Sequence, residues 1–230
     1  MIVSFASSKG GVGKSTACAA IGARLAQRGE EVVILDLDQN RTVDRWGRKR
    51  KITGLTIKAI ERDSFTTIFR ELREAGATNS PDHILIDLAG AREATVLKAI
   101  ARSDLVVIPA QASEPDLREA LVVVSDIKDV GEEMPAPIPY RVLLTKMPAL
   151  RTRVTDYAYQ ELARHGLPIF KTGMGERVAY REMFLNGHPP DPTSAAGAEV
   201  AALTTEMEDI VKAAQNQAAT RLAAGQGGSR

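Results

Sequence analysis

A glycine-rich segment near the start of the chain has the residue types that bind phosphate. Residues 9–16 read Lys-Gly-Gly-Val-Gly-Lys-Ser-Thr and stand between an apolar run and a stretch of helical periodicity. Glycines let backbone N–H groups converge on phosphate oxygens, and a helix that begins there adds the positive end of its dipole. The predicted phosphate-binding residues are Gly10, Gly11, Val12, Gly13, Lys14, Ser15 and Thr16.

Two side chains of this segment have roles set by the mechanics of such a loop. Lys14 is expected to reach the β- and γ-phosphates of a nucleotide, and the Ser15 hydroxyl is expected to ligate Mg²⁺. ATP and Mg²⁺ are therefore the expected substrate and cofactor. A strand before the segment and a helix after it make a chance match of this kind rare.

Carboxylates follow two further apolar runs. Asp36 and Asp38 end the run at residues 31–36, and Asp87 ends the run at residues 83–87. Because parallel strands end at the same edge of a sheet, these groups are expected beside the phosphate loop. We predict that Asp36 and Asp87 serve the metal, Asp87 directly or through water. A helix cap or a turn is the alternative for Asp87.

Hydrolysis of a γ-phosphate needs a group that orients water and positive charge that stabilises the transition state. Asp38 is the candidate for the first role. Lys9 is the candidate for the second, because an ordinary phosphate loop does not require a lysine at the start of its glycine run. A solvated loop lysine is the alternative. With Lys14, these are the predicted catalytic residues.

The fold must bring these segments to the same edge of a sheet, and the hydrophobic pattern predicts what that fold is. Short apolar runs alternate with amphipathic stretches, which favours an α/β fold with a single-domain, doubly wound, mostly parallel sheet flanked by helices. Strands are predicted at residues 2–7, 31–36, 83–87, 105–109, 140–145 and 167–171, with a minor one possible at 55–60. Helices are predicted at residues 15–27, 64–75, 93–102, 116–130, 153–165 and 178–185.

Three prolines within residues 186–193 separate this pattern from a last helix of about twenty residues. Its apolar stripe, expected to close the core, is Val200, Leu203, Met207, Ile210 and Val211. Residues 221–230 have almost no bulky apolar side chain and are predicted to be a disordered tail or a cloning remnant. The predicted domain is residues 1–220.

Composition excludes several classes of protein. The 230 residues include 44% hydrophobic ones, enough for one core, and 30 basic against 29 acidic residues, so the chain is no uniformly basic nucleic-acid binder. Cys18 is the single cysteine, which excludes an internal disulfide and an iron–sulfur cluster held by several thiolates of one chain. With no run of about 20 apolar residues, we expect a cytoplasmic protein.

Three segments together resemble the ParA/MinD family of deviant Walker ATPases: KGGVGKST, VVILDLDQN and HILIDLAG. The resemblance implies an ATP-driven sandwich dimer in which Lys9 reaches the phosphates of the other subunit. It also assigns Asp38 to the attacking water and Gly90 to a loop that senses the γ-phosphate. The chain departs from the common pattern at Gln39-Asn40 and at the Leu-Ala-Gly that follows Asp87.

Within that family, DLDQNRTVDRW and ERVAYREMFLNG are most similar to small single-domain ParA proteins and to VirC-type proteins that assist DNA transfer. Thr145 and Lys146 resemble the adenine-side loop of related proteins, and residues 175–180 are expected to complete the base pocket. A helix-flanking charge is the alternative for Lys146.

A ParA-type role needs clustered basic residues that displace the counterions of DNA. The candidates are Arg45, Arg48, Lys49, Arg50 and Lys51, within a run that starts at Arg41 and includes Trp46. An ordinary solvated helix face explains this run equally well. A second, more dilute set comprises Arg151, Arg153, Arg164, Lys171, Arg177 and Arg181.

The overall expectation is a weak ATPase that is stimulated by a ParB-like, relaxosome or cargo partner. Its ATP-bound dimer is expected to bind the DNA of the nucleoid non-specifically. The expected settings are plasmid or chromosome partition, DNA transfer and cargo positioning. MinD-like membrane cycling is disfavoured, because residues 213–230 hold one leucine and no aromatic residue. A metabolic ligase or kinase on the same scaffold is the other alternative. His83, His165 and His188 are scattered and mark no substrate pocket for it.

Overall fold

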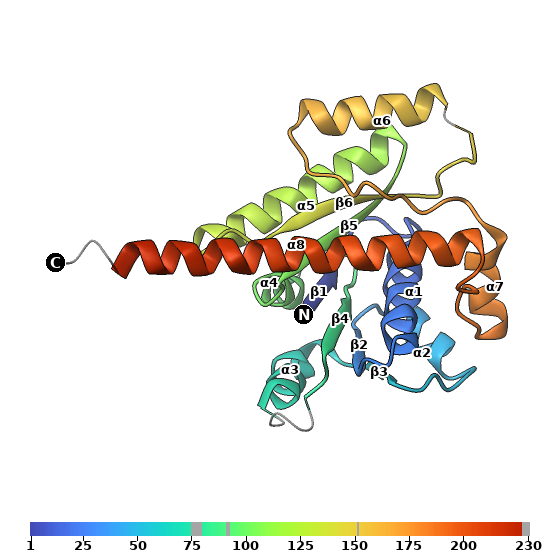
Figure 1. Ribbon diagram of the computed structural model, residues 1–230, viewed down its shortest axis with the longest axis horizontal. Coiled ribbons are helices and arrows are strands. Elements are labelled where there is room, and N and C mark those ends of the chain that lie inside the picture. The colour runs from blue at the N-terminus through green and yellow to red at the C-terminus, as the bar shows by residue number, and fades with distance from the viewer. Residues whose placement is uncertain (75–79, 91–92, 151, 227–230) are drawn as a thin grey trace.

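The fold is one parallel sheet between two layers of helices (Figure 1). The computed structural model describes residues 1–74, 80–90, 93–150 and 152–226. The strands are β1 Ile2–Phe5, β2 Val32–Asp36, β3 Leu55–Ala59, β4 His83–Asp87, β5 Leu105–Gln111 and β6 Tyr140–Thr145. Their order is β3-β2-β4-β1-β5-β6, and every neighbouring pair is parallel. The predicted doubly wound α/β class is confirmed.

Helices alternate with these strands along the chain. They are α1 Lys14–Gln27, α2 Thr42–Gly47, the 3-10 helix η1 Arg62–Ser64, α3 Phe65–Glu74, α4 Ala94–Ile100, α5 Glu114–Glu132, α6 Arg153–Arg164, α7 Val178–Asn186 and α8 Ala195–Gln226. One apolar cluster joins α3, α4, α5 and α6 to one face of the sheet, and a second joins α1, α2, α7 and α8 to the other. Both faces of the sheet are therefore covered, as its apolar strands require.

Neighbouring residues of a strand serve opposite cores. Ile34 is buried in the cluster that contains α1, and Leu35 is buried in the cluster that contains α5. This alternation follows from the two-residue period of a strand. The parallel register between β2 and β4 pairs Asp36 with Asp87, so these two strand-end residues lie side by side.

Residues 167–171, predicted to be a strand, do not pair with the sheet over their length. The minor strand predicted at residues 55–60 is instead a full member of the sheet, as β3. Only an isolated bridge joins Val142 to Ile169. Pro168 has no N–H to donate toward Tyr140, so the ladder cannot continue in that direction. The carbonyl of Tyr140 instead accepts a hydrogen bond from the Arg141 guanidinium at 2.8 Å.

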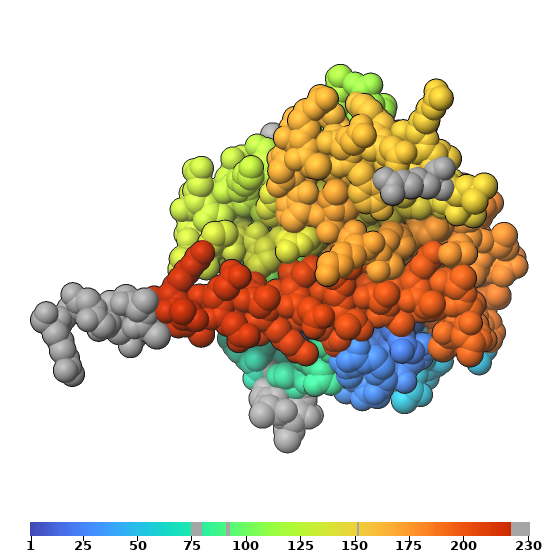
Figure 2. Space-filling view, turned by 45° about the horizontal axis from the view of Figure 1, so that its top comes forward, coloured from blue at the N-terminus to red at the C-terminus, as the bar shows by residue number. Residues whose placement is uncertain are grey.

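The final helix is longer than predicted. α8 has 32 residues and ends at Gln226, so residues 221–226 are helical and only residues 227–230 lie outside the described part of the chain. The frequent alanines after Val211 have high helix propensity, which the missing bulky residues had concealed. The predicted stripe does close the core, with Ile210 partly buried beside four buried residues. The described side chains of α8 beyond Val211 are half-buried or exposed, and the C-terminal end of the helix extends past the body of the protein (Figures 1 and 2).

No helix among the described residues is both long enough and apolar enough to cross a membrane.

Candidate functional site

The phosphate loop presents its backbone rather than a side-chain cap to the start of α1. Gly11 and Gly13 have φ values of 79° and 91°, a region that glycine adopts without strain. Gly13 is the N-cap of α1 and makes no side-chain hydrogen bond to the helix. The first N–H groups of α1 are thus free of side-chain capping and suited to an anion.

A buried threonine supports the loop from behind. The Thr145 hydroxyl donates to the carbonyl of Val12 at 2.6 Å, and a Cβ on Gly13 would meet the Thr145 side chain at 3.5 Å. Thr145, predicted as a base-side residue, therefore lies under the loop backbone. The next residue, Lys146, is exposed and has a φ of 51°, unusual for a residue with a side chain.

Lys14 joins the predicted acidic residues. Its Nζ atom lies 2.6 Å from Asp87 Oδ1 and 3.2 Å from Asp38 Oδ2, and its side chain is 7% exposed. Burial alone would lower the pKa of Lys14, but Asp87 and Asp38 outweigh this effect and raise it. Burial also raises the pKa of Asp87, although Lys14 and Ser15 oppose the increase. The two predicted catalytic residues Lys14 and Asp38 are thus brought together.

The residues predicted to serve Mg²⁺ divide into two groups. The Ser15 hydroxyl donates to Asp87 Oδ2 at 2.7 Å, and hydroxyl and carboxylate oxygens are the donors that Mg²⁺ prefers. Asp36 is fully buried and accepts backbone N–H groups instead, from Asp38 at 3.1 Å and from Asp44 at 2.9 Å. The pair Ser15 and Asp87 fits the metal. A metal role for Asp36 stays a prediction.

Two cavities flank the phosphate loop. One of about 560 Å³ lies on the side of Thr145 and is lined by Gly13, Thr16, Thr145, Lys146, Met174, Gly175, Glu176, Arg177, Tyr180, Arg181 and Phe184. The other, of about 380 Å³, is lined by Lys9, Gly10, Gly11, Lys14, Asp38, Gln39, Asn40, Thr42, Arg62, Ala89, Gly90 and Glu93. The first is predicted to receive the base of a nucleotide, and the second its terminal phosphate. We call them the base cavity and the phosphate cavity.

A polar network supports the wall of the base cavity. Glu199 of α8 accepts hydrogen bonds from the Tyr180 hydroxyl at 2.8 Å, from Arg177 Nη2 at 2.6 Å and from the backbone N–H of Gly175 at 3.1 Å. Burial, followed by Glu199, raises the pKa of Tyr180. Gly175, Glu176, Arg177 and Tyr180 therefore line this cavity, and their role at a nucleotide base stays a prediction. Glu199, 19 residues after Tyr180, gave no local signal of its part in this wall.

Lys9 pairs with a carboxylate of its own chain. Its Nζ atom contacts Asp116 in the first turn of α5, where Asp116 is 2% exposed and Lys9 is 45% exposed. The simple alternative, a lysine surrounded by solvent, does not describe this contact. Sequence reasoning did not identify Asp116, although Ser113, three residues earlier, marks the start of a helix there by accepting its N–H.

The amino-acid sequence matches a known protein family over most of its length. A family model described as VirC1 protein matches residues 1–191. The chain belongs to the VirC1 family. The protein ParA of Rhizobium radiobacter is 30% identical over 190 residues, which cover 81% of this chain and 83% of that protein. The protein virC1 of Rhizobium rhizogenes is 28% identical over 190 residues, covering 79% of each chain.

The fold of this VirC1-family chain is also that of a solved ATPase. It superposes on the cell division ATPase MinD of Pyrococcus furiosus with a TM-score of 0.70 at 18% identity, covering 91% of this chain and 98% of the other. The predicted ParA/MinD relationship, with VirC-type proteins close by, is confirmed. Membership implies nucleotide hydrolysis in general.

The predicted DNA-binding residues of this VirC1-family chain are all exposed at the end of α2. We call Arg45, Arg48, Lys49, Arg50 and Lys51 the basic corner. It adjoins α7, because Lys49 donates to the carbonyl of Leu185 at 3.1 Å and Arg50 lies 2.9 Å from His188 Nε2. Trp46 is buried and packs near Phe184. The tryptophan thus anchors the basic corner instead of extending it.

The second basic set does not form one patch. Arg153 and Arg164 lie on α6, whereas Arg181 lies on α7, and these helices cover opposite faces of the sheet. Arg164, Arg177 and Arg181 pair with Glu161, Glu199 and Glu176, respectively. Arg151 lies outside the described residues. α6 and α7 therefore cannot contribute to one basic surface on the same face of the sheet.

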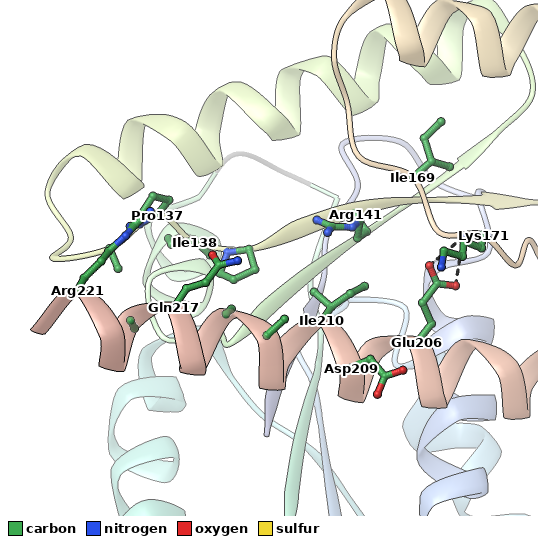
Figure 3. A pocket seen from close by; sticks show the side chains of 15 residues that line it. Pro137, Ile138, Arg141, Ile169, Lys171, Glu206, Asp209, Ile210, Gln217 and Arg221 are labelled. Carbon is green, nitrogen blue, oxygen red and sulfur yellow. Dashed lines mark hydrogen bonds between the residues drawn. The ribbon is translucent and has the colours of Figure 1, made fainter. Parts of the chain in front are cut away.

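Two further features lie away from the phosphate loop. A groove of about 590 Å³ runs between α8 and β6, where Glu206 accepts the N–H of Lys171 at 2.9 Å (Figure 3). It contains none of the predicted nucleotide-binding residues. Glu30, His83 and Glu208 form the one described group with metal-ligand spacing, but Arg28 pairs with both carboxylates. That group therefore fastens α8 to the body.

Proposed function

We propose that this VirC1-family chain is an ATP-dependent switch. Its ATP form is a homodimer that binds DNA non-specifically through the basic corner, and hydrolysis releases the DNA. Plasmid or chromosome partition is the first setting proposed, followed by assistance in DNA transfer and positioning of a cargo over the nucleoid. A ParB-like, relaxosome or cargo protein stimulates an otherwise weak ATPase.

One observation supports the coupling between nucleotide and DNA. The buried carboxylate of Asp36 accepts hydrogen bonds from the backbone N–H of Asp38 and from that of Asp44. Asp38 lines the phosphate cavity, and Asp44 lies in α2, whose far end carries the basic corner. A shift of Asp38 toward a γ-phosphate would therefore be transmitted through Asp36 to α2 and to the basic residues at its end.

The chemistry of the proposed switch uses residues that already meet. Lys14 exchanges its carboxylate partners for the β- and γ-phosphates, and Asp38, once free of Lys14, orients the attacking water. Ser15 and Asp87 would hold Mg²⁺, which neutralises phosphate charge when it is bound. Lys9 leaves Asp116 and reaches the phosphates of the second subunit, which ties dimerisation to ATP.

The test is DNA binding measured with ADP and with a non-hydrolysable ATP analogue over a salt series. Wild type, Lys9→Ala and Asp38→Ala are compared. Lys9→Ala is expected to lose dimerisation and analogue-dependent DNA binding, because the contact between subunits is gone. Asp38→Ala is expected to keep DNA binding but to hydrolyse ATP poorly.

Other outcomes separate the alternatives. DNA affinity that ignores the nucleotide contradicts the proposed switch. An ATP turnover that rises with a small-molecule acceptor, and not with DNA or a protein partner, supports a metabolic enzyme instead. Binding to anionic vesicles only in the presence of the ATP analogue supports membrane cycling.

A further inference from the structure

Arg62 is a cation in the phosphate cavity that the proposed mechanism leaves unused. It is the first residue of η1, which follows β3 after Ile60 and Glu61, and it lines the same cavity as Lys9, Lys14 and Asp38. Its side chain is 37% exposed, and its Nε atom lies 2.8 Å from Oε2 of Glu93. Nothing in the glycine-rich motif predicts an arginine contributed by this distant segment.

The neighbouring Arg41 already has its own structural partners. Its guanidinium donates to the carbonyls of Asp36 and Ile60, both at 2.8 Å, and pairs with Glu61 at 2.5 Å. Removing it would leave the carbonyl groups at the end of β2 and just after β3 without this donor. Arg41 therefore has a structural task, and it is a poor candidate for a ligand contact.

Arg62 differs from Arg41 in the strength of its attachment. Its ion pair with Glu93 joins two partly exposed side chains, and pairs of this kind contribute little to stability. A charge-assisted, bidentate contact with phosphate is stronger and suits the planar guanidinium. The exchange of Glu93 for a phosphate group is thus favourable for Arg62.

The backbone that carries Arg62 is nevertheless fixed beside the site. The N–H of Ile60 donates to the carbonyl of Asp36 at 3.1 Å, and Arg41 ties Glu61 to the same end of β2. Arg62 follows directly. Its side chain therefore starts from a well-defined position next to the segment that carries Asp38.

We propose that Arg62 is a phosphate-binding residue that distinguishes ATP from ADP by leaving Glu93 and binding the terminal phosphoryl group. This inference rests on the proposed function, because it takes ATP as the ligand. The arginine acts within its own subunit, whereas the proposed role of Lys9 is across the dimer. Glu93, which follows the Gly90 loop closely in sequence, is released in the same step.

The test measures the affinity of the full chain for a non-hydrolysable ATP analogue and for ADP. Arg62→Ala is expected to weaken the analogue by at least about tenfold, as the loss of a charge-assisted hydrogen bond predicts, while ADP affinity changes by less than about twofold. Arg62→Lys should recover only part of the loss, because lysine lacks the planar fork. Glu93→Gln should tighten the analogue, because it frees Arg62.

Arg164→Ala is the matched control, since Arg164 also forms an exposed pair with a glutamate, but on α6. An equal loss of ADP and analogue affinity in Arg62→Ala, or no loss at all, overturns the inference. If wild type binds and hydrolyses ATP while Arg62→Ala is unchanged, only this inference fails. If wild type binds no ATP analogue, the proposed function fails first.

Discussion

The Nζ atom of Lys9 contacts Oδ1 of Asp116 within the same chain. Asp116 is buried at the start of α5, where its backbone N–H is held by the Ser113 hydroxyl oxygen at 3.4 Å. A lysine that serves the phosphates of a second subunit must first leave this carboxylate. The Lys9–Asp116 contact is therefore expected to oppose formation of the proposed dimer and to raise the ATP concentration at which the dimer forms.

Asp116→Asn should lower the concentration of ATP analogue needed for dimerisation. Asparagine has nearly the same size and keeps a hydrogen-bonding group, but it lacks the charge that holds Lys9. The dimer fraction can be followed by analytical ultracentrifugation during an analogue titration. Glu114→Gln, which removes an exposed carboxylate paired with Arg118, is the control. An unchanged midpoint for Asp116→Asn would show that the contact does not restrain dimerisation.

Asp36→Ala should uncouple α2 from the nucleotide site. It removes the acceptor for two backbone N–H groups and should cost about 1–3 kcal/mol of unfolding free energy for each buried group left unpaired. It should also reduce the difference in DNA affinity between the ADP and ATP-analogue states. Denaturant titration and DNA binding measure the two effects.

Asp36→Asn is the control for that change, because its single amide oxygen can still accept one of the two hydrogen bonds. It should lie between wild type and Asp36→Ala in both measurements. Equal DNA coupling in all three proteins, at equal folded fraction, would contradict the path from Asp38 to α2.

Charge removal at the basic corner should weaken DNA binding without regard to sequence. Arg45→Ala and Lys51→Ala should each reduce the slope of log affinity against log salt by about two for the proposed dimer, because one phosphate contact is lost in each of its two subunits. DNA binding by fluorescence anisotropy over a salt series measures the slope. Lys128→Ala, an exposed lysine on α5, should leave it unchanged. Equal slopes in all variants would place the DNA elsewhere.

Stability should fall at alkaline pH. Burial, followed by Glu199, raises the pKa of Tyr180 above its ordinary value of 10.0, and Asp87 and Asp38 outweigh burial to raise the pKa of Lys14 above 10.5. Above these ordinary values the folded state binds more protons than the unfolded state, so stability decreases with pH. The contribution is complete below them and is lost as pH rises through the folded-state pKa values.

Tyr180→Phe should flatten this decline, because phenylalanine has no proton to lose. At neutral pH it should cost about 1 kcal/mol for the lost hydrogen bond to Glu199. Thermal unfolding between about pH 9 and pH 11 covers the onset of the decline. Tyr157→Phe, at an exposed tyrosine of α6, is the control. A decline identical in wild type and Tyr180→Phe would exclude Tyr180 as a source.

The sequence by itself determined the class of fold and the core of the phosphate site. Both follow from short-range physics: alternating apolar runs need covering helices, and residues 9–16 need only their own backbone to converge on phosphate. The carboxylates at strand ends could also be placed, because parallel strands share one edge. The alanines at the end of α8 also favour a helix, but the lack of bulky apolar residues there favours a disordered tail, and the sequence alone does not decide between the two.

Only the tertiary structure decided which groups pair. Lys9 with Asp116, Arg62 with Glu93 and Tyr180 with Glu199 join segments that no local pattern connects. Such contacts depend on the order of strands in the sheet and on which helices cover each face. For the same reason the sequence could indicate a basic run at residues 41–51, while only packing showed that Trp46 is its buried anchor.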